Sequence, residues 1–175
     1  TRILAGIVFV SENRKTEGLA QLRSIADNAT LSHMGPFSRG GWLRLGRRRQ
    51  AMDRWMQALQ IKARNQDQAV AELSGGNQQK VVIAKWLSLG PKVLLLDEPT
   101  RGVDVGAKQE IYRLMEELAE QGVAVLFASS EMEEVLGMSD RVLVMHEGRL
   151  AGELSRDEMN EEAIMYLATG KGVTG

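Results

Sequence analysis

Two short segments of this chain carry side chains that can act on a phosphate group. In residues 73–80 (LSGGNQQK), Ser74 stands at an expected helix start, where unpaired backbone amides and two glycines accept a close anion. Residues 93–100 (VLLLDEPT) place two carboxylates, Asp97 and Glu98, after an apolar run. One carboxylate there can hold Mg²⁺ through water, and its neighbour can orient and deprotonate an attacking water. Ser-Gly-Gly alone would be an ordinary helix cap, so the argument depends on both segments together.

Composition narrows the class of protein. The chain has 175 residues, of which 43% are hydrophobic, enough for one domain with a core. A net charge of −1 gives no overall basic field for nucleic acid, and the absence of cysteine excludes disulfides and thiolate metal sites. No apolar run approaches the roughly 20 residues that span a bilayer. We therefore expect any membrane role to come through a partner.

Strands and helices are predicted to alternate, which favours a parallel α/β sheet. Ser130 and Ser155 each begin a capping-box pattern, which predicts a helix start. Predicted strands cover residues 5–10, 92–96, 123–128, 141–145 and 149–153, and predicted helices include 76–89 and one whose apolar face holds Ile111, Leu114, Met115 and Leu118.

Residues 17–72 are mixed and helix-prone, with turns at Gly35-Pro36 and Gly40-Gly41. A stripe of Met52, Trp55, Met56 and Leu59 has helical spacing and indicates a packed helix face. Two interpretations of the basic cluster Arg44 with Arg47–Arg49 stay open. It is a solvated helix start, or it contacts a transmembrane subunit or lipid headgroups.

The spacing of residues 73–80 and 93–100 resembles that of the signature and Walker B motifs of ATP-binding cassette (ABC) ATPases. The ending Asn77–Lys80 resembles the monosaccharide importers of that family. This resemblance implies a P-loop NTPase-like α/β fold, a parallel sheet with helices on both faces, plus a helical subdomain. It divides the chain into a core strand and Q-loop (1–12), a helical subdomain with the signature motif (13–90), and the remaining core with a C-terminal helix (91–175).

The resemblance also implies roles for individual residues. The signature segment contacts ATP held by the opposing domain, so it acts in trans across a head-to-tail dimer. Asp97 holds Mg²⁺ through water and Glu98 is the general base. The nucleotide-binding residues carried over from the family are Ser74, Gly75, Gly76 and Gln78.

Three further positions follow from the resemblance. Glu12 stands where the family's Q-loop usually has glutamine, which makes it a further candidate for contact with the metal, although a solvated charged turn explains it too. Asp104 falls in the D-loop and also suits the N-cap of the following helix. Ser130 occupies the position of the switch histidine. Serine cannot carry a proton at neutral pH as imidazole can, so we read Ser130 as a helix cap and expect this domain's own site to be slow or inactive.

The phosphate-cradling Walker A pattern G-x-x-x-x-G-K-[ST] does not occur in the sequence. We therefore expect the chain to be the later part of a second nucleotide-binding domain, preceded by that loop in a longer protein. We also expect weak ATP binding by the isolated chain. The missing strand is expected beside the Walker B strand, in the middle of the sheet, leaving an edge that a second copy could pair with.

The resemblance implies transmembrane permease subunits and another nucleotide-binding domain as partners, and a periplasmic sugar-binding protein indirectly, at the cytoplasmic face of the inner membrane. Ribose, xylose and galactose all stay open as the sugar. No nucleic acid partner is expected, because ABC ATPases that act on DNA or ribosomes would show sustained heptads or a basic linker. A catalytically silent scaffold half of the ATPase dimer remains the alternative.

Overall fold

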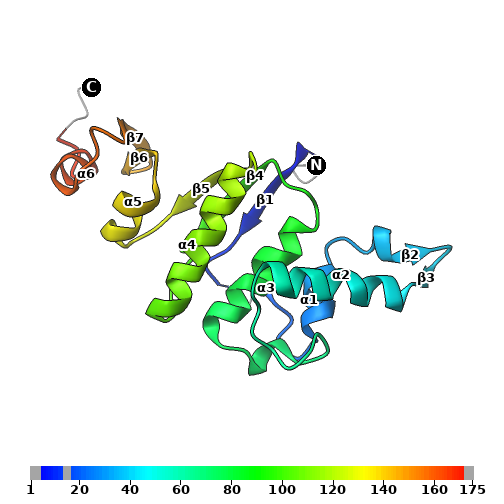
Figure 1. Ribbon diagram of the computed structural model, residues 1–175. Coiled ribbons are helices and arrows are strands. Elements are labelled where there is room, and N and C mark those ends of the chain that lie inside the picture. The colour runs from blue at the N-terminus through cyan, green and yellow to red at the C-terminus, as the bar shows by residue number, and fades with distance from the viewer. Residues whose placement is uncertain (1–4, 14–16, 172–175) are drawn as a thin grey trace. The chain divides into compact units, whose positions relative to one another are not determined.

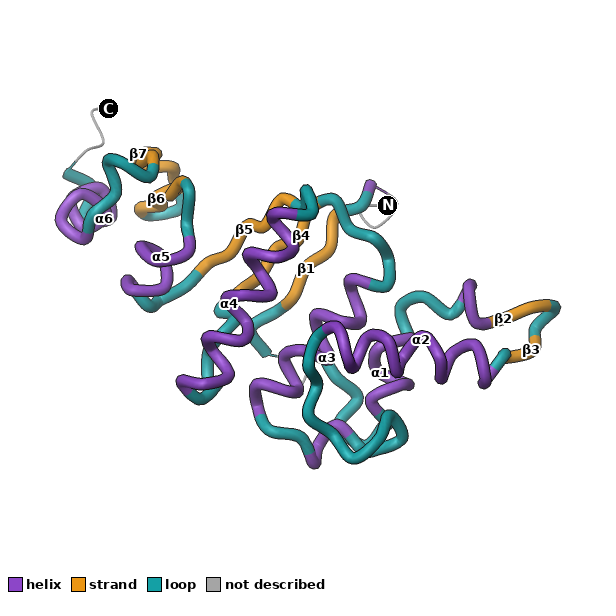
Figure 2. Tube along the Cα trace, in the orientation of Figure 1, coloured by secondary structure: helices purple, strands orange, loops and turns teal. Residues whose placement is uncertain are grey.

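The computed structural model describes residues 5–13 and 17–171 and divides the chain into two compact units, Thr1–Ala128 and Ser129–Gly175 (Figures 1 and 2). Both the expected core strand and the expected helical subdomain belong to the first unit.

A parallel three-stranded sheet lies at the centre of the first unit. Its strands are β1 (Ile7–Val10), β4 (Val93–Asp97) and β5 (Ala124–Ala128), in the order β1-β4-β5. The expectation of a vacancy beside the Walker B strand is wrong for this sheet, since β4 has a partner on each side. Among the described strands, the open edges belong to β1 and β5.

The two faces of this sheet differ in their cover. The helices α3 (Gly75–Leu87) and α4 (Val105–Glu120) pack on β1 and β5 respectively and on each other. Side chains alternate between the two faces along each strand, and one face of the sheet is buried. On that face Val8 of β1 stands in register with Leu94 of β4. Phe9 and Leu126 belong to the other face and are 53% and 55% exposed. The α/β fold class is confirmed. Within the described residues, the buried face of the sheet is the one that α3 and α4 cover.

Between β1 and α3 the chain forms helices and one small hairpin. The helices are α1 (Ile25–Thr30) and α2 (Leu45–Ala58), with short 3₁₀ helices η3 (Gly35–Phe37) and η4 (Val70–Glu72). The predicted stripe on α2 is confirmed, since Met52 and Leu59 are buried and the other two members half-buried.

The hairpin consists of β2 (Ser38–Arg39) and β3 (Trp42–Leu43). The predicted Gly40-Gly41 turn joins them, and both glycines have positive φ, as a type I′ turn requires. The strands themselves were not predicted, because two residues are too few to show an alternating pattern.

The second unit contains α5 (Met132–Met138), the antiparallel hairpin β6 (Arg141–His146) and β7 (Arg149–Ser155), and α6 (Glu161–Ala168). The predicted hairpin turn is confirmed, since Glu147 and Gly148 both have positive φ. Its small core consists of Val142, Val144 and Ile164 with partly buried neighbours.

Both predicted capping boxes are wrong. α5 begins at Met132 with Glu131 in the N-cap position and no side-chain cap hydrogen bond, so Ser130 is not the cap. α6 is capped by Asn160, whose side chain accepts from the Ala163 amide at 2.8 Å. The Ser155 amide and hydroxyl instead both donate to the Glu158 carboxylate, which closes a turn before the helix.

The first turn of α3 lies directly against the first turn of α4. Gly76 is buried, and a Cβ added there would stand 2.4 Å from the Ala107 Cβ and 3.4 Å from Val103 Cγ1. No other residue fits at position 76 without moving α4, because a contact of 2.4 Å lies far inside van der Waals distance. This glycine therefore sets how closely the two helices approach.

An ion-pair cluster joins the same two helices one turn further on. Lys80, whose side chain is 2% exposed, donates at 2.8 Å to Glu110 on α4 and at 3.1 Å to the Gln60 carbonyl. Lys62 donates at 3.0 Å to the other oxygen of Glu110. Hydrogen bonds from Lys80 and then Lys62 hold the pKa of Glu110 below its ordinary value of 4.5.

We expect Gly76→Ala to lower the free energy of unfolding by about 1–3 kcal/mol, because its methyl group overlaps that of Ala107. Gly46→Ala on α2 is the matched control. A Cβ there meets nothing within 4 Å, so we expect a gain of about 0.5–1 kcal/mol from helix propensity. Urea unfolding of both variants measures the difference, and equal midpoints would contradict the packing argument.

Glu110→Gln should destabilise the chain by about 1–3 kcal/mol at neutral pH, because it leaves the buried Lys80 ammonium without its counter-charge. A carboxylate with a lowered pKa stabilises the fold above about pH 4.5 and loses that effect as pH falls through its folded value. The deficit should therefore shrink in acid. Urea midpoints against pH test this, with Glu116→Gln on the exposed side of α4 as the control; a deficit independent of pH would refute the ion-pair explanation.

Candidate functional site

Ser74 is held so that its hydroxyl proton remains available for a ligand. It is the N-cap of α3, and its Oγ accepts from the Asn77 amide at 3.4 Å and from Asn77 Nδ2 at 2.9 Å. Asn77 is fixed in turn by the Lys62 amide, which donates to its Oδ1 at 2.8 Å. A hydroxyl has two acceptor positions and one proton, so a Ser74 that accepts twice can still donate once. The side chain is exposed, as a residue that binds an external anion must be.

The structure gives the neighbouring signature residues different surroundings. Gly75 is half-buried at the first position of α3, where its amide is one of the unpaired donors. Gly76 is needed for the contact with α4. Gln78 is 5% exposed, and its Nε2 donates to the Val70 and Leu73 carbonyls, both at 3.2 Å. This amide braces the loop that leads into Ser74, so within the chain Gln78 is a positioning residue, and its contact with nucleotide stays a prediction.

The two carboxylates stand where β4 ends. Asp97 is the last residue of β4, half-buried and in register with Ala128 of β5. Glu98 has a φ of 47°, in the left-handed region that costs a non-glycine residue about 1 kcal/mol or more. Its amide donates to the Ala128 carbonyl at 2.9 Å, which holds the strained turn against β5. The backbone thus turns sharply between the two carboxylates.

Glu12 forms an ion pair with Arg101. Glu12 follows β1 and Arg101 follows β4, and adjacent parallel strands bring these two loops to the same edge of the sheet. The predicted metal candidate is thus neutralised by a guanidinium in this arrangement. No role for Arg101 was predicted. The sequence shows only that Arg101 and Glu12 carry opposite charges, not that they meet.

Asp104 is the N-cap of α4, as predicted, with its Oδ1 accepting from the Ala107 amide at 3.0 Å. Because Gly76 contacts both Val103 and Ala107, the D-loop segment 100–104 lies beside the turn that carries Ser74. Two segments that are distant in the sequence therefore form one local surface. The communication role of Asp104 remains a prediction.

Ser130 belongs to the second unit. The neighbouring Ser129 hydroxyl accepts from the Glu131 amide at 3.0 Å, so a serine turn, rather than a capping box, precedes α5. Serine at the switch position still provides no imidazole for a phosphate.

No group of three or more His, Cys, Asp or Glu side chains within residues 5–13 and 17–171 could hold a metal ion. Asp97, half-buried at the end of β4, stays the predicted magnesium residue, since Mg²⁺ usually keeps several waters and takes few protein carboxylates.

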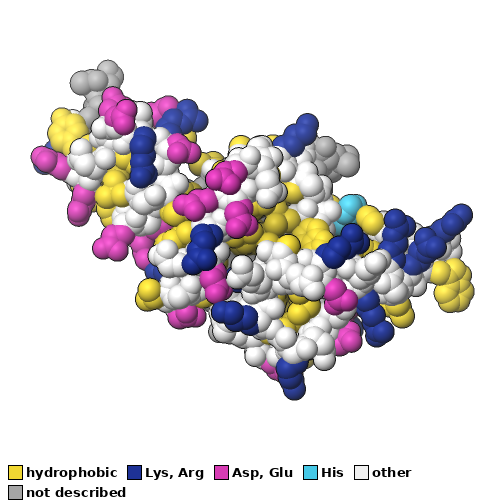
Figure 3. Space-filling model, viewed as in Figure 1, with side chains coloured by type: hydrophobic (Ala, Val, Ile, Leu, Met, Phe, Trp, Pro, Cys, Tyr) yellow, Lys and Arg dark blue, Asp and Glu magenta, His cyan; other side chains and the backbone are white. Residues whose placement is uncertain are grey.

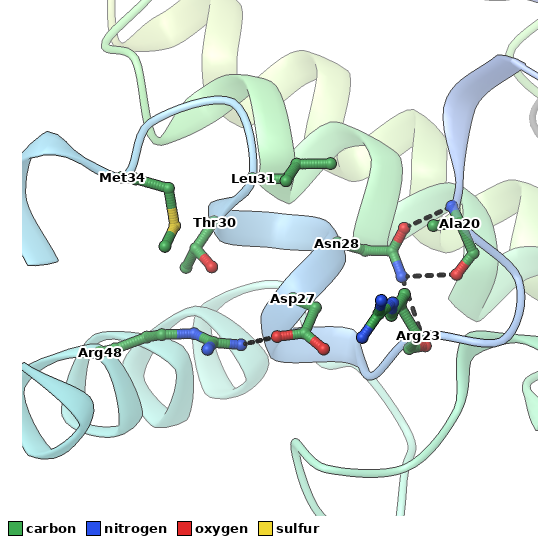
Figure 4. Close-up of a pocket in the computed structure, with 8 residues that line it drawn as sticks. All are labelled: Ala20, Arg23, Asp27, Asn28, Thr30, Leu31, Met34 and Arg48. Atoms are coloured by element: carbon green, nitrogen blue, oxygen red, sulfur yellow. Dashed lines mark hydrogen bonds and ion pairs between the residues drawn. The ribbon is translucent and has the colours of Figure 1, made fainter. Parts of the chain in front are cut away.

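A pocket of about 300 Å³ lies between α1 and α2, in the helical part (Figure 4). Arg48 reaches across it to Asp27. Asn28 of α1 holds the preceding loop by two hydrogen bonds with the backbone of Ala20. Burial raises the pKa of Asp27, but hydrogen bonds from Arg48 and Ser24 outweigh it and leave the pKa lowered. None of the lining residues belongs to the signature or Walker B segments, so we do not assign the nucleotide to this pocket.

Comparison with known sequences identifies close relatives. The chain is 56% identical to the ribose import ATP-binding protein RbsA of Bacillus licheniformis and 54% identical to that of Bacillus subtilis, over 94% of its own length in each case. It covers 34% of each relative, so it spans about a third of the length of the curated relatives that it matches.

Solved structures share the fold. A dimeric bacterial ABC transporter cassette, MJ0796, is 26% identical with a TM-score of 0.68, over 85% of this chain and 62% of that one. The cassette MJ1267 in its ADP conformation, at 23% identity, has a TM-score of 0.70 over 96% of this chain and 66% of its own.

The family model described as ABC transporter matches residues 3–101. Because that match covers more than half of the residues, the chain belongs to the ABC transporter family.

Proposed function

We propose that this chain is part of the ATP-hydrolysing subunit of an ABC importer for a monosaccharide. The names of the RbsA relatives support this, and ribose is the sugar that they favour. The single observation that carries the proposal is the exposed Ser74 hydroxyl. Both of its acceptor positions are filled by Asn77, which leaves its proton and the first amides of α3 able to donate to an external anion.

We infer that this anion is the terminal phosphate of ATP held by another nucleotide-binding domain. A signature turn that lies next to the D-loop gives one continuous surface for a second cassette. The dimeric cassette among the solved relatives supports an assembly of this kind.

The acidic pair serves the nucleotide bound on this chain's own side. Asp97 holds Mg²⁺ through water, and the metal supplies positive charge to the phosphates when it is bound. Glu98 orients the attacking water and accepts its proton. The backbone turns between Asp97 and Glu98, and the hydrogen bond from the Glu98 amide to the Ala128 carbonyl holds this turn. Two adjacent carboxylates can therefore take different roles. Glu12, the further candidate for the metal, would approach it either with its second oxygen or after its ion pair with Arg101 opened.

The partners follow from the same assignment. The chain acts with permease subunits, another nucleotide-binding domain and, indirectly, a periplasmic sugar-binding protein, at the cytoplasmic face of the inner membrane. None of the helices described is long and apolar enough to cross a bilayer. The second candidate is a silent scaffold that lends Ser74 to its partner's site, and Ser130 at the switch position favours it.

Ser74→Arg in the intact ATP-binding subunit should lower transport at least about a hundredfold, because a guanidinium replaces the donor and blocks the phosphate. Ala71→Arg, an exposed position three residues earlier, is the matched control and should transport normally. Circular dichroism of both variants monitors the fold. Normal transport by a folded Ser74→Arg protein would count against the proposal.

Glu98→Gln separates the two candidates. If this chain's own site hydrolyses ATP, the substitution should lower turnover of the intact subunit about 10²–10⁴-fold while nucleotide binding is retained. Glu116→Gln is the control. Turnover that tolerates Glu98→Gln but is lost with Ser74→Arg would establish the scaffold. Steady hydrolysis by the purified 175-residue chain, insensitive to Glu98→Gln, would contradict both.

A further inference from the structure

A long segment of the first unit carries only positive charge. Between Asp27 and Asp53 there is no acidic residue, although the whole chain has a net charge of −1. The segment contains the β2–β3 hairpin and the start of α2, and its five arginines are Arg39, Arg44, Arg47, Arg48 and Arg49.

The hairpin holds a large aromatic side chain in water. Trp42 is 83% exposed and pairs across the strands with Arg39, so the two side chains project from the same face of the hairpin. A Cβ added at Gly40 or Gly41 would meet nothing within 4 Å, so the tip of the hairpin is convex and unpacked. Figure 3 shows dark blue side chains gathered around apolar ones over the end of the first unit that carries the hairpin.

The start of α2 has the wrong charges for its own stability. Arg44 occupies the N-cap without a side-chain cap hydrogen bond, and the first turn has no acidic residue. Cations at the positive end of a helix are unfavourable. Arg48 and Arg49 have acidic partners, whereas Arg39, Arg44 and Arg47 have none among the residues that the structure describes. An external anion bound here would offset the unfavourable positive charge at the start of α2.

We propose that this surface binds the headgroups of anionic lipids at a membrane. We call it the hairpin face and define it as Arg39, Trp42, Arg44 and Arg47. Arginines near a tryptophan that is 83% exposed match a bilayer interface, where phosphates lie above an apolar layer.

Two arguments favour lipid headgroups over other anions. A soluble phosphate would contact the arginines and leave Trp42 in water. An acidic polypeptide segment would pair with the arginines but would offer the exposed indole of Trp42 no apolar layer, and the tip has open space around its glycines. A bilayer surface takes up both the charge and the indole. This binding does not depend on the nucleotide chemistry.

Vesicle co-sedimentation of the 175-residue chain tests the proposal. We expect binding to vesicles of phosphatidylglycerol with phosphatidylcholine, weakened by added salt, and none to pure phosphatidylcholine. Arg44→Gln/Arg47→Gln should weaken binding about thirtyfold, since each arginine near an anionic leaflet contributes roughly fivefold. Trp42→Ala should weaken it about tenfold and abolish a blue shift of tryptophan emission.

Arg113→Gln/Arg149→Gln removes the same charge from exposed positions elsewhere and should bind as the unaltered chain does. All replaced side chains are exposed, and urea midpoints check that the fold is unchanged. The proposal is overturned by binding to neutral vesicles, by equal loss in the control variant, or by no vesicle binding. Binding to polyglutamate without binding to vesicles would assign the face to an acidic protein instead.

Discussion

The contact between the first turns of α3 and α4 is the constraint on which the candidate site depends. Gly76 has no side chain, so α4 approaches until Ala107 fills the space where a Cβ would stand. That approach places the D-loop beside Ser74. The pairing of Lys80, whose side chain is 2% exposed, with Glu110 then holds the helices at this spacing. A small change in the distance between these helices would move the serine and the D-loop together.

The sequence predicts those parts of this unit whose signal is local. The apolar runs that became β1, β4 and β5 are short and continuous, and the helix starts at Ser74 and Asp104 carry their own capping side chains. The capping boxes at Ser130 and Ser155 failed for a physical reason. A serine followed by a glutamate can close a turn as well as begin a helix, and the pattern does not say which backbone conformation follows.

The roles that could not be predicted come from tertiary contacts. Gly76 and Gln78 lie in a motif associated with phosphate, yet one fits against α4 and the other braces a loop. The order of the strands was also misjudged, because sequence shows where a strand lies but not which strands flank it. The ion pair between Glu12 and Arg101 joins loops nearly ninety residues apart, and no local pattern reveals it.

The positive φ of Glu98 has a consequence for how this domain can change over evolution. Glycine adopts that conformation without strain, so a glycine there would relax the turn after β4 by about 1 kcal/mol while removing the carboxylate. Under the proposed role of Glu98 as general base, selection for a relaxed backbone and selection for the carboxylate therefore oppose each other at this position. A lineage that retains glutamate there keeps the carboxylate and, with it, the strained backbone conformation.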